Sequence, residues 1–107
     1  MLLQRYFFVF LLKIKSKMTY DIEAIKTELQ NITDWTFKNN GIEKQFQFKN
    51  FSAALAFIVQ VGILSEKANH HPELFNVYNK VSIRLTTHDM GGVTAKDFSL
   101  AKAIDAI

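Results

Sequence analysis

The amino-acid sequence predicts an α+β domain, in which a four-stranded antiparallel sheet carries three helices packed on one face. Two observations lead to this fold class. Apolar residues recur at helical spacing in three segments, and between these segments lie two pairs of short alternating stretches joined by turn residues. Strands joined by short turns pair antiparallel, and helices that alternate with such hairpins pack on one side of the sheet. The expected order is helix, two strands, helix, two strands, helix.

The length and composition are those of one globular domain. The chain has 107 residues, of which 49% are hydrophobic and 21% charged, which is too apolar for intrinsic disorder. The absence of cysteine excludes disulfide scaffolds, cysteine-ligated metals and thiol catalysis, and no P-loop or dinucleotide-binding glycine pattern is present. Residues 18–107 carry nine Lys/Arg against ten Asp/Glu, a net charge of −1, without a basic stripe. Direct binding to nucleic acid is therefore not expected.

The first 17 residues differ from the rest of the chain. They hold four basic residues and no acidic one, and residues 6–12 are an unbroken run of seven apolar residues. A membrane-spanning helix needs about 20 apolar residues, and a secretory signal places its basic residues before the apolar run, whereas here they follow it. Three interpretations stay open: a translated upstream stretch with Met18 as the true start, an organellar or surface-binding amphipathic leader, or an ordered extra helix. Residues 18–107 form the expected domain, and we expect no membrane association and a cytoplasmic location.

The first half of the domain should contain a helix and a hairpin. A helix is expected over residues 20–32, because apolar residues recur three or four positions apart and acidic residues lie near its start. Residues 35–38 and 42–48 are strand candidates, and Asn39-Asn40-Gly41 between them is a turn signal, since Asn and Gly tolerate positive φ. Four aromatic residues of this region are expected in the core or in a cavity wall: Trp35, Phe46, Phe48 and Phe51.

Residues 51–68 form the longest expected helix, and apolar residues extend around most of its circumference. The main apolar face is expected to consist of Phe51, Ala54, Leu55, Ile58, Val61 and Gly62, with Phe57, Leu64 and Ala68 off that face. A helix that is apolar nearly all round is buried on more than one side. In a domain this small the second side needs another subunit, so a homo-oligomer is expected.

The second half of the domain should contain another hairpin and a last helix. Pro72 ends the helical region, because the residue before a proline avoids the α conformation. Residues 75–80 and 81–88 alternate and are expected as two strands or as one long bent strand, and residues 89–92 are expected as a turn. The last helix is expected over residues 94–107, where Thr94 and Asp97 have the spacing of a capping box.

All three histidines fall within a stretch of 19 residues: His70, His71 and His88. Histidine titrates nearest to neutral pH, so this cluster indicates an acid–base site. His70 and His71 are adjacent and therefore point in different directions, so they are not expected to chelate one metal ion. The sheet could bring His88 near the helix exit that carries the other two. Asp97 either only caps its helix or has a role near the site, and Glu66 is either a solvated helix charge or a supporting residue.

A string of residues at fixed spacing runs through this region. It reads Glu66-x-x-x-His70-His71-Pro72, then Tyr78, Val81, Thr87-His88, Gly92-x-Thr94-x-x-Asp97 and Ala101. Upstream lies the aromatic pattern Phe46-x-Phe48-x-x-Phe51-x-x-Ala54-x-x-Phe57. Together, over residues 35–104, these motifs resemble the pterin-4a-carbinolamine dehydratase family. The double His-Pro alone would be weak, whereas the whole string is specific.

The resemblance implies a hydro-lyase that removes water from 4a-hydroxytetrahydropterin and gives quinonoid dihydropterin, in the recycling of tetrahydrobiopterin. It also implies the α+β fold above, a homodimer or homotetramer, a pterin substrate, and neither a metal nor an organic cofactor. Because histidine can give or take a proton near neutral pH, we expect His71 to be the main acid/base and His70 its partner in positioning and proton exchange. By the resemblance, His88 assists near the pterin ring.

The resemblance further implies roles for the residues around the histidines. Pro72, Thr87 and Asp89 correspond to substrate contacts. Glu66 and Asp97 are expected to orient histidines or to hold the shape of the site. Leu74 stands where the family often has Trp, which puts the affinity or the substrate preference in question rather than the reaction.

Two alternatives to catalysis stay open. One is a dimerisation or coactivator module, because an animal member of the family serves as dimerisation cofactor of a homeodomain transcription factor through its oligomer-forming helix. The other is a pterin-binding module without activity. A catalytically dead copy is expected to lose a histidine, and this chain keeps all three.

Overall fold

The fold is described from a computed structural model that covers Tyr6 and residues 18–107. Its elements in chain order are α2 (Ile22–Leu29), β1 (Thr36–Lys38), β2 (Gly41–Gln47), α3 (Phe51–Ala68), β3 (Glu73–Val77), β4 (Lys80–Leu85), the 3₁₀-helix η1 (His88–Met90) and α4 (Ala95–Asp105). The interpretations of the N-terminal segment concern residues that, Tyr6 apart, lie outside the described ones.

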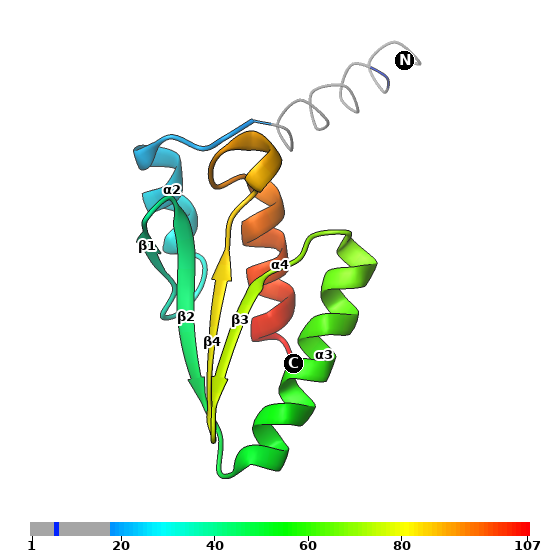
Figure 1. Cartoon of the computed structure of the whole chain (residues 1–107). Helices are drawn as coiled ribbons and strands as arrows, with labels where there is room; N and C mark the ends of the chain where they lie inside the picture. The colour runs from blue at the N-terminus through cyan, green and yellow to red at the C-terminus, as the bar shows by residue number, and fades with distance from the viewer. Residues whose placement is uncertain (1–5, 7–17) are drawn as a thin grey trace.

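The four strands form one antiparallel sheet in the order β1-β2-β4-β3. The second hairpin therefore lies beside the first with β4 inside and β3 at an edge, as Figure 1 shows. Along β4, Val81, Ile83 and Leu85 are buried, whereas Ser82 and Arg84 alternate with them on the opposite face. The core lies between that buried face and the helices, so the predicted α+β fold is confirmed.

Side-chain caps explain where the helices begin. The Asp21 side chain accepts a hydrogen bond from the Ala24 N–H at 2.8 Å, and the Asn50 side chain accepts one from the Ala53 N–H at 2.9 Å. Each cap satisfies a backbone donor that the first turn leaves without a helical partner. The predicted capping box at the start of α4 is confirmed.

Several predicted boundaries were wrong by one to three residues. The helix predicted over 20–32 is α2, which starts after Asp21 because Asp21 has an extended backbone and its side chain caps the first turn. The stretches 75–80 and 81–88, predicted as two strands or as one long bent strand, form the two strands β3 and β4, because Tyr78 has a φ of 50° and forms a tight turn with the residue after it. The first two residues of the turn predicted at 89–92 belong to the 3₁₀-helix η1.

The bounds predicted for α3 are confirmed, but the predicted face was wrong. The residues that α3 buries are Ala54, Phe57, Val61 and Ser65. Phe51 and Leu55, predicted on the core face, are 47% and 46% exposed, so Phe51 is not in the core. Because α3 is apolar nearly all round, the spacing pattern allows two stripes, and only packing against β4 and α4 decides between them.

Within residues 18–107, α3 is the one helix that is long and apolar enough to cross a membrane. A helix in the core of a folded domain passes the same test of length and composition. In this chain α3 packs against α4 and β4, as a core helix does.

Candidate active site

The exit of α3 sends two consecutive histidines in different directions. Asn69 ends the helix in the left-handed conformation, with a φ of 50°, and its N–H donates to the Glu66 carbonyl. The next N–H, that of His70, donates to the Ser65 carbonyl at 3.0 Å. His70 is buried, whereas His71 is exposed. The prediction that the two rings point apart is therefore confirmed.

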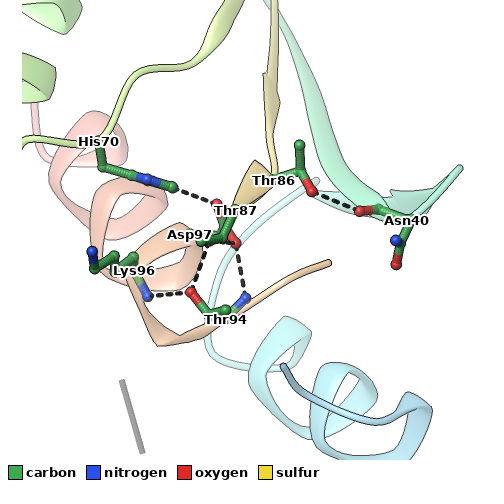
Figure 2. A network of polar contacts seen from close by, with 7 residues as sticks. All are labelled: Asn40, His70, Thr86, Thr87, Thr94, Lys96 and Asp97. Carbon is green, nitrogen blue, oxygen red and sulfur yellow. Dashed lines mark hydrogen bonds and ion pairs between the residues drawn. The ribbon is translucent and has the colours of Figure 1, made fainter. Parts of the chain in front are cut away.

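His70 is held by a buried carboxylate. Its Nε2 lies 2.6 Å from Oδ1 of Asp97, whose side chain is fully buried in the first turn of α4. Oδ2 of Asp97 accepts two more hydrogen bonds, from the Thr87 hydroxyl and from the Thr94 N–H, each at 2.8 Å. Figure 2 shows this network, which joins the α3 exit, the chain after β4 and the start of α4.

Asp97 thus has both of the roles considered for it. It accepts from the N-cap backbone, as the acid of a capping box does, and it contacts the ring of His70. A charged carboxylate accepts hydrogen bonds and donates none, and three donors converge on this one. The arrangement holds the plane of the His70 ring and orients its Nε2 toward α4.

His71 forms a second, exposed pair. Its Nε2 lies 2.7 Å from Oε1 of Glu66, and the two side chains are 58% and 80% exposed. Glu66 therefore contacts His71 and is also a solvated helix charge. Beside this pair lies a surface groove of about 540 Å³, lined by Val59, Gly62, Ile63, Ser65, Glu66, His71, Pro72 and Leu74.

His88 and Asp89 lie in η1, directly after Thr87, and both are exposed. Neither side chain has a hydrogen bond or ion pair to another described residue. Thr87 is the link to the α3 exit, because its hydroxyl contacts the same carboxylate as His70. The hydroxyl of Thr87, predicted to contact substrate, is in this structure engaged by Asp97 and Thr94.

Two features of the site were missed by sequence reasoning. The hydroxyl of Thr94 lies 2.8 Å from that of Thr87, and both residues are buried. The capping-box spacing was the available signal, but it does not reveal which strand packs against the cap. The left-handed Asn69 was also missed, although Asn is the non-glycine residue that most readily ends a helix in that conformation.

The grooves and charged groups limit other uses of the site. In residues 18–107 no three His, Asp or Glu side chains are grouped so that they could hold a metal ion. Another groove, of about 600 Å³, is lined by sheet residues such as Glu43, Glu73 and Arg84 and by no histidine. The site therefore offers two imidazoles, each with a carboxylate partner, an arrangement suited to proton transfer.

A family model described as pterin 4 alpha carbinolamine dehydratase matches residues 18–107. The chain belongs to this family. A member from Chloroflexus aurantiacus, which carries the provisional name pterin-4-alpha-carbinolamine dehydratase, is 49% identical over 83 residues, or 78% of this chain and 89% of the relative. A Prochlorococcus marinus protein of the same provisional name is 52% identical over 73 residues, covering 68% of this chain and 77% of the relative.

Solved structures of pterin dehydratase-like proteins share the fold. The Brucella melitensis structure described as transcriptional coactivator/pterin dehydratase matches with a TM-score of 0.80 and 34% identity, over 82% of this chain and 96% of that one. A pterin dehydratase-like protein described as a RuBisCO assembly factor matches with a TM-score of 0.56 and 23% identity, over 67% of this chain and 83% of that one. The latter likeness concerns the fold alone.

Proposed function

We propose that this member of the pterin dehydratase family is an active hydro-lyase, which dehydrates 4a-hydroxytetrahydropterin to quinonoid dihydropterin. The observation that carries the proposal is the pair of oriented imidazoles at the α3 exit. One ring, that of His70, is buried on Asp97, and the next, that of His71, is exposed on Glu66. A site that only bound pterin would not need two neighbouring histidines that each have a carboxylate partner.

The reaction needs one acid and one base. The C4a–O bond breaks and its electron pair leaves with the oxygen, so an acid must protonate the departing hydroxyl to give water. The N5–H electron pair forms the C4a–N5 double bond, so a base must take that proton. One proton is given and one is taken, and no redox partner is needed. Each such transfer typically contributes about 10²–10⁴ in rate.

The exposed ring of His71 is suited to the role of main acid/base. His71 is 58% exposed, so it can meet the substrate and exchange protons with water between turnovers. Pro72 and Leu74 border the same groove and would wall the flat pterin ring. Glu66 is expected to orient His71. In this proposal His70 assists by positioning and proton exchange, and His88 and Asp89 approach the ring from η1.

The proposal is tested by following the dehydration of freshly generated 4a-hydroxytetrahydropterin by ultraviolet absorbance. The wild-type chain should accelerate the reaction, and His71→Ala should lose about 10²-fold or more of that acceleration. His70→Ala and His88→Ala should lose a smaller part of this acceleration. Gln47→Ala, on the exposed end of β2, is the control and should keep wild-type activity.

Two outcomes would count against this proposal. No acceleration by the wild type, with pterin still bound, would favour the pterin-binding module. Equal losses for all three histidine variants would contradict the ranking that makes His71 the main acid/base.

We further propose that the protein assembles as a homodimer or homotetramer. Four apolar residues on α3, each four positions from the next, are about half exposed or more: Phe51, Leu55, Val59 and Ile63. We call them the α3 stripe. The edge strand β3 adds exposed Phe75 and Val77. An exposed apolar surface of this kind is typical of an interface between proteins.

The α3 stripe also favours a second candidate function, that of a dimerisation module for another protein. The description of the Brucella melitensis relative includes a coactivator role. Light scattering of the chain alone and mixed with a candidate partner separates the two uses. A self-assembly that the partner does not change supports the homo-oligomer, whereas mixed oligomers of defined mass support the module. We retain a cytoplasmic location as part of the proposal.

A further inference from the structure

The hydroxyls of Thr87 and Thr94 are linked to His70 through Asp97. Their hydrogen-bond contacts determine where each hydroxyl hydrogen points. Thr87 Oγ1 lies 2.8 Å from Oδ2 of Asp97 and 2.8 Å from Thr94 Oγ1. The carboxylate accepts, so the single hydroxyl proton of Thr87 points to Asp97. Thr94 must then donate its hydroxyl proton to Thr87, while its own oxygen accepts from the Lys96 N–H at 3.2 Å.

The hydrogen bonds therefore run one way, from Lys96 through Thr94 and Thr87 to Asp97 (Figure 2). The Thr94 N–H is a second donor to Oδ2. With Oδ2 occupied by two donors, Oδ1 is left to His70 Nε2 at 2.6 Å. Because the carboxylate donates no hydrogen bond, Nε2 carries the hydrogen, which fixes the tautomer of the neutral ring.

The other ring nitrogen of His70 remains available. In the described part of the chain, every buried side-chain nitrogen and oxygen has a hydrogen-bond partner. Nδ1 of His70 has none among those residues, so it belongs to the 10% of the side chain that is exposed. In the neutral Nε2–H tautomer this nitrogen carries the lone pair and is the basic atom of the ring.

We propose that Thr87 and Thr94 are positioning residues, which hold the Asp97 carboxylate against the Nε2–H of His70 and so leave Nδ1 as the ring nitrogen that exchanges a proton during the reaction. The proton exchange rests on the proposed dehydratase function, whereas the tautomer does not. The inference gives the buried hydroxyl of Thr87 to the carboxylate rather than to the substrate.

The first test reads the tautomer directly, on the full chain labelled with ¹⁵N at histidine. The ring nitrogens of wild-type His70 should show the Nε2–H form alone, with a low-field proton signal from the hydrogen bond to Asp97. In Thr87→Val and Thr94→Val, which keep the side-chain shape without the hydroxyl, the Nε2–H form should remain because Asp97 still accepts, but its proton signal should move to higher field because the carboxylate is held less firmly. Thr87→Ser and Thr94→Ser should restore the wild-type spectrum.

Thr86→Val is the matched control. Thr86 neighbours Thr87, but its hydroxyl donates to the Asn40 carbonyl at 2.9 Å and lies outside the one-way chain (Figure 2). The His70 spectrum of Thr86→Val should be that of the wild type. A change as large as in Thr87→Val would mean that any hydroxyl loss at this end of the sheet disturbs the ring.

The second test is kinetic. The two Val variants should lower kcat by about 5- to 30-fold, the cost of one or two hydrogen bonds in a buried network, with KM unchanged within about two-fold. The Ser variants should recover the rate. A general loosening of the fold would move KM as well and would not be rescued by Ser.

The outcomes separate the two proposals. If the wild type has no dehydratase activity but its His70 is the Nε2–H tautomer, the proposed function is overturned and the positioning network is not. An active wild type whose His70 is the Nδ1–H tautomer, or Val variants that keep both the low-field proton signal and the rate, overturn the positioning role. If one Val variant does not fold, the other still decides, because each removes one hydroxyl from the same series of hydrogen bonds.

Discussion

Glu66 and His71 form a hydrogen bond in a strongly exposed setting, so its contribution lies in orientation rather than in stability. Surface pairs typically contribute about 0–1 kcal/mol. We expect Glu66→Gln to change the free energy of unfolding by less than about 0.5 kcal/mol, but to lower kcat several-fold because the ring of His71 can rotate. Urea unfolding and the absorbance assay check the two parts. A variant that is destabilised but fully active would contradict this role.

Asp97 has the opposite balance, because its carboxylate is buried and accepts from three donors. Asp97→Asn replaces one acceptor by an amide donor that faces other donors. We expect it to lower the free energy of unfolding by about 2–4 kcal/mol and kcat by at least about ten-fold.

Asp105→Asn is the matched comparison for this substitution. Asp105 lies on the same helix and accepts from Trp35 Nε1 and Lys44 Nζ, each at 2.9 Å, away from the histidines. Asp105→Asn should lower the free energy of unfolding by about 1 kcal/mol and leave kcat unchanged. If both variants lowered the free energy of unfolding and neither lowered kcat, Asp97 would be only a structural residue.

The identity of the site residues was predictable, but their connections were not. Spacing along the chain indicated His70, His71 and Asp97, because side chains of these types at this spacing carry the family resemblance. Spacing cannot say that Glu66 contacts His71, since that depends on the left-handed turn at Asn69. Likewise, the engagement of Thr87 by Asp97 depends on how β4 packs against α4.

Among the elements, the β1–β2 hairpin depends on a close approach between Gly41 and Arg84. A Cβ at Gly41 would lie 2.5 Å from the Arg84 guanidinium, which donates to the carbonyls of Lys38 and Asn39. We expect Gly41→Ala to displace this side chain and lower the free energy of unfolding by about 1–2 kcal/mol, as measured in urea.

Gly62 provides the contrast for that substitution. In α3 a Cβ at Gly62 would meet nothing within 4 Å. Gly62→Ala should therefore raise the free energy of unfolding by about 0.5–1 kcal/mol, because alanine has less freedom to lose on folding. Equal losses of stability in the two variants would mean that the close approach of Gly41 to Arg84 does not cause the loss.

Tyr20 ties the chain before α2 to α4, and this link should depend on pH. Its ring stacks on Phe98, with centroids 5.8 Å apart, and its N–H donates to the Val93 carbonyl. Burial, with the nearby Glu28 carboxylate, raises the pKa of Tyr20 above 10.0. The folded state then holds the phenol proton more tightly, so this stabilisation is present below pH 10 and is lost as the pH rises through the folded pKa.

Denaturant unfolding between about pH 8 and 11 checks this dependence. Tyr20→Phe should remove the part of the stability loss that belongs to the phenol, because phenylalanine does not titrate. An identical loss in both proteins would assign it to other groups.

Element types followed from the sequence more closely than their faces did. The helix predicted over 51–68 has those bounds, because Asn50 and Asn69 cap it and apolar spacing fills it. Its buried stripe was predicted wrongly, since an all-round apolar helix carries no polar face to orient it. The strand order β1-β2-β4-β3 also lay beyond local patterns, because it is decided by pairing between β2 and β4.

On the whole molecule, the α3 stripe and the groove beside His71 share two residues, Val59 and Ile63. A partner subunit seated on the stripe would therefore also border that groove. Leu55 belongs to the stripe but not to the groove lining, so Leu55→Lys separates assembly from local damage.

We expect Leu55→Lys to reduce the oligomer mass seen by light scattering, because a charge in an apolar interface has no partner there. Its activity should fall if the partner completes the groove wall. Gln60→Lys, which adds the same charge to an exposed polar position of α3, should leave both mass and activity unchanged. An unchanged mass for Leu55→Lys would exclude the stripe as the interface.

The sharing of one carboxylate between a helix cap and a histidine has a consequence for how this protein can change under selection. Active-site residues often reduce stability, so stabilising replacements at them are easy to find and cost activity. Under the proposed function Asp97 serves the fold and the site at once, so drift toward a more stable but inactive chain would be blocked at this position. A library randomised at Asp97 and sorted for thermal stability alone should therefore recover aspartate.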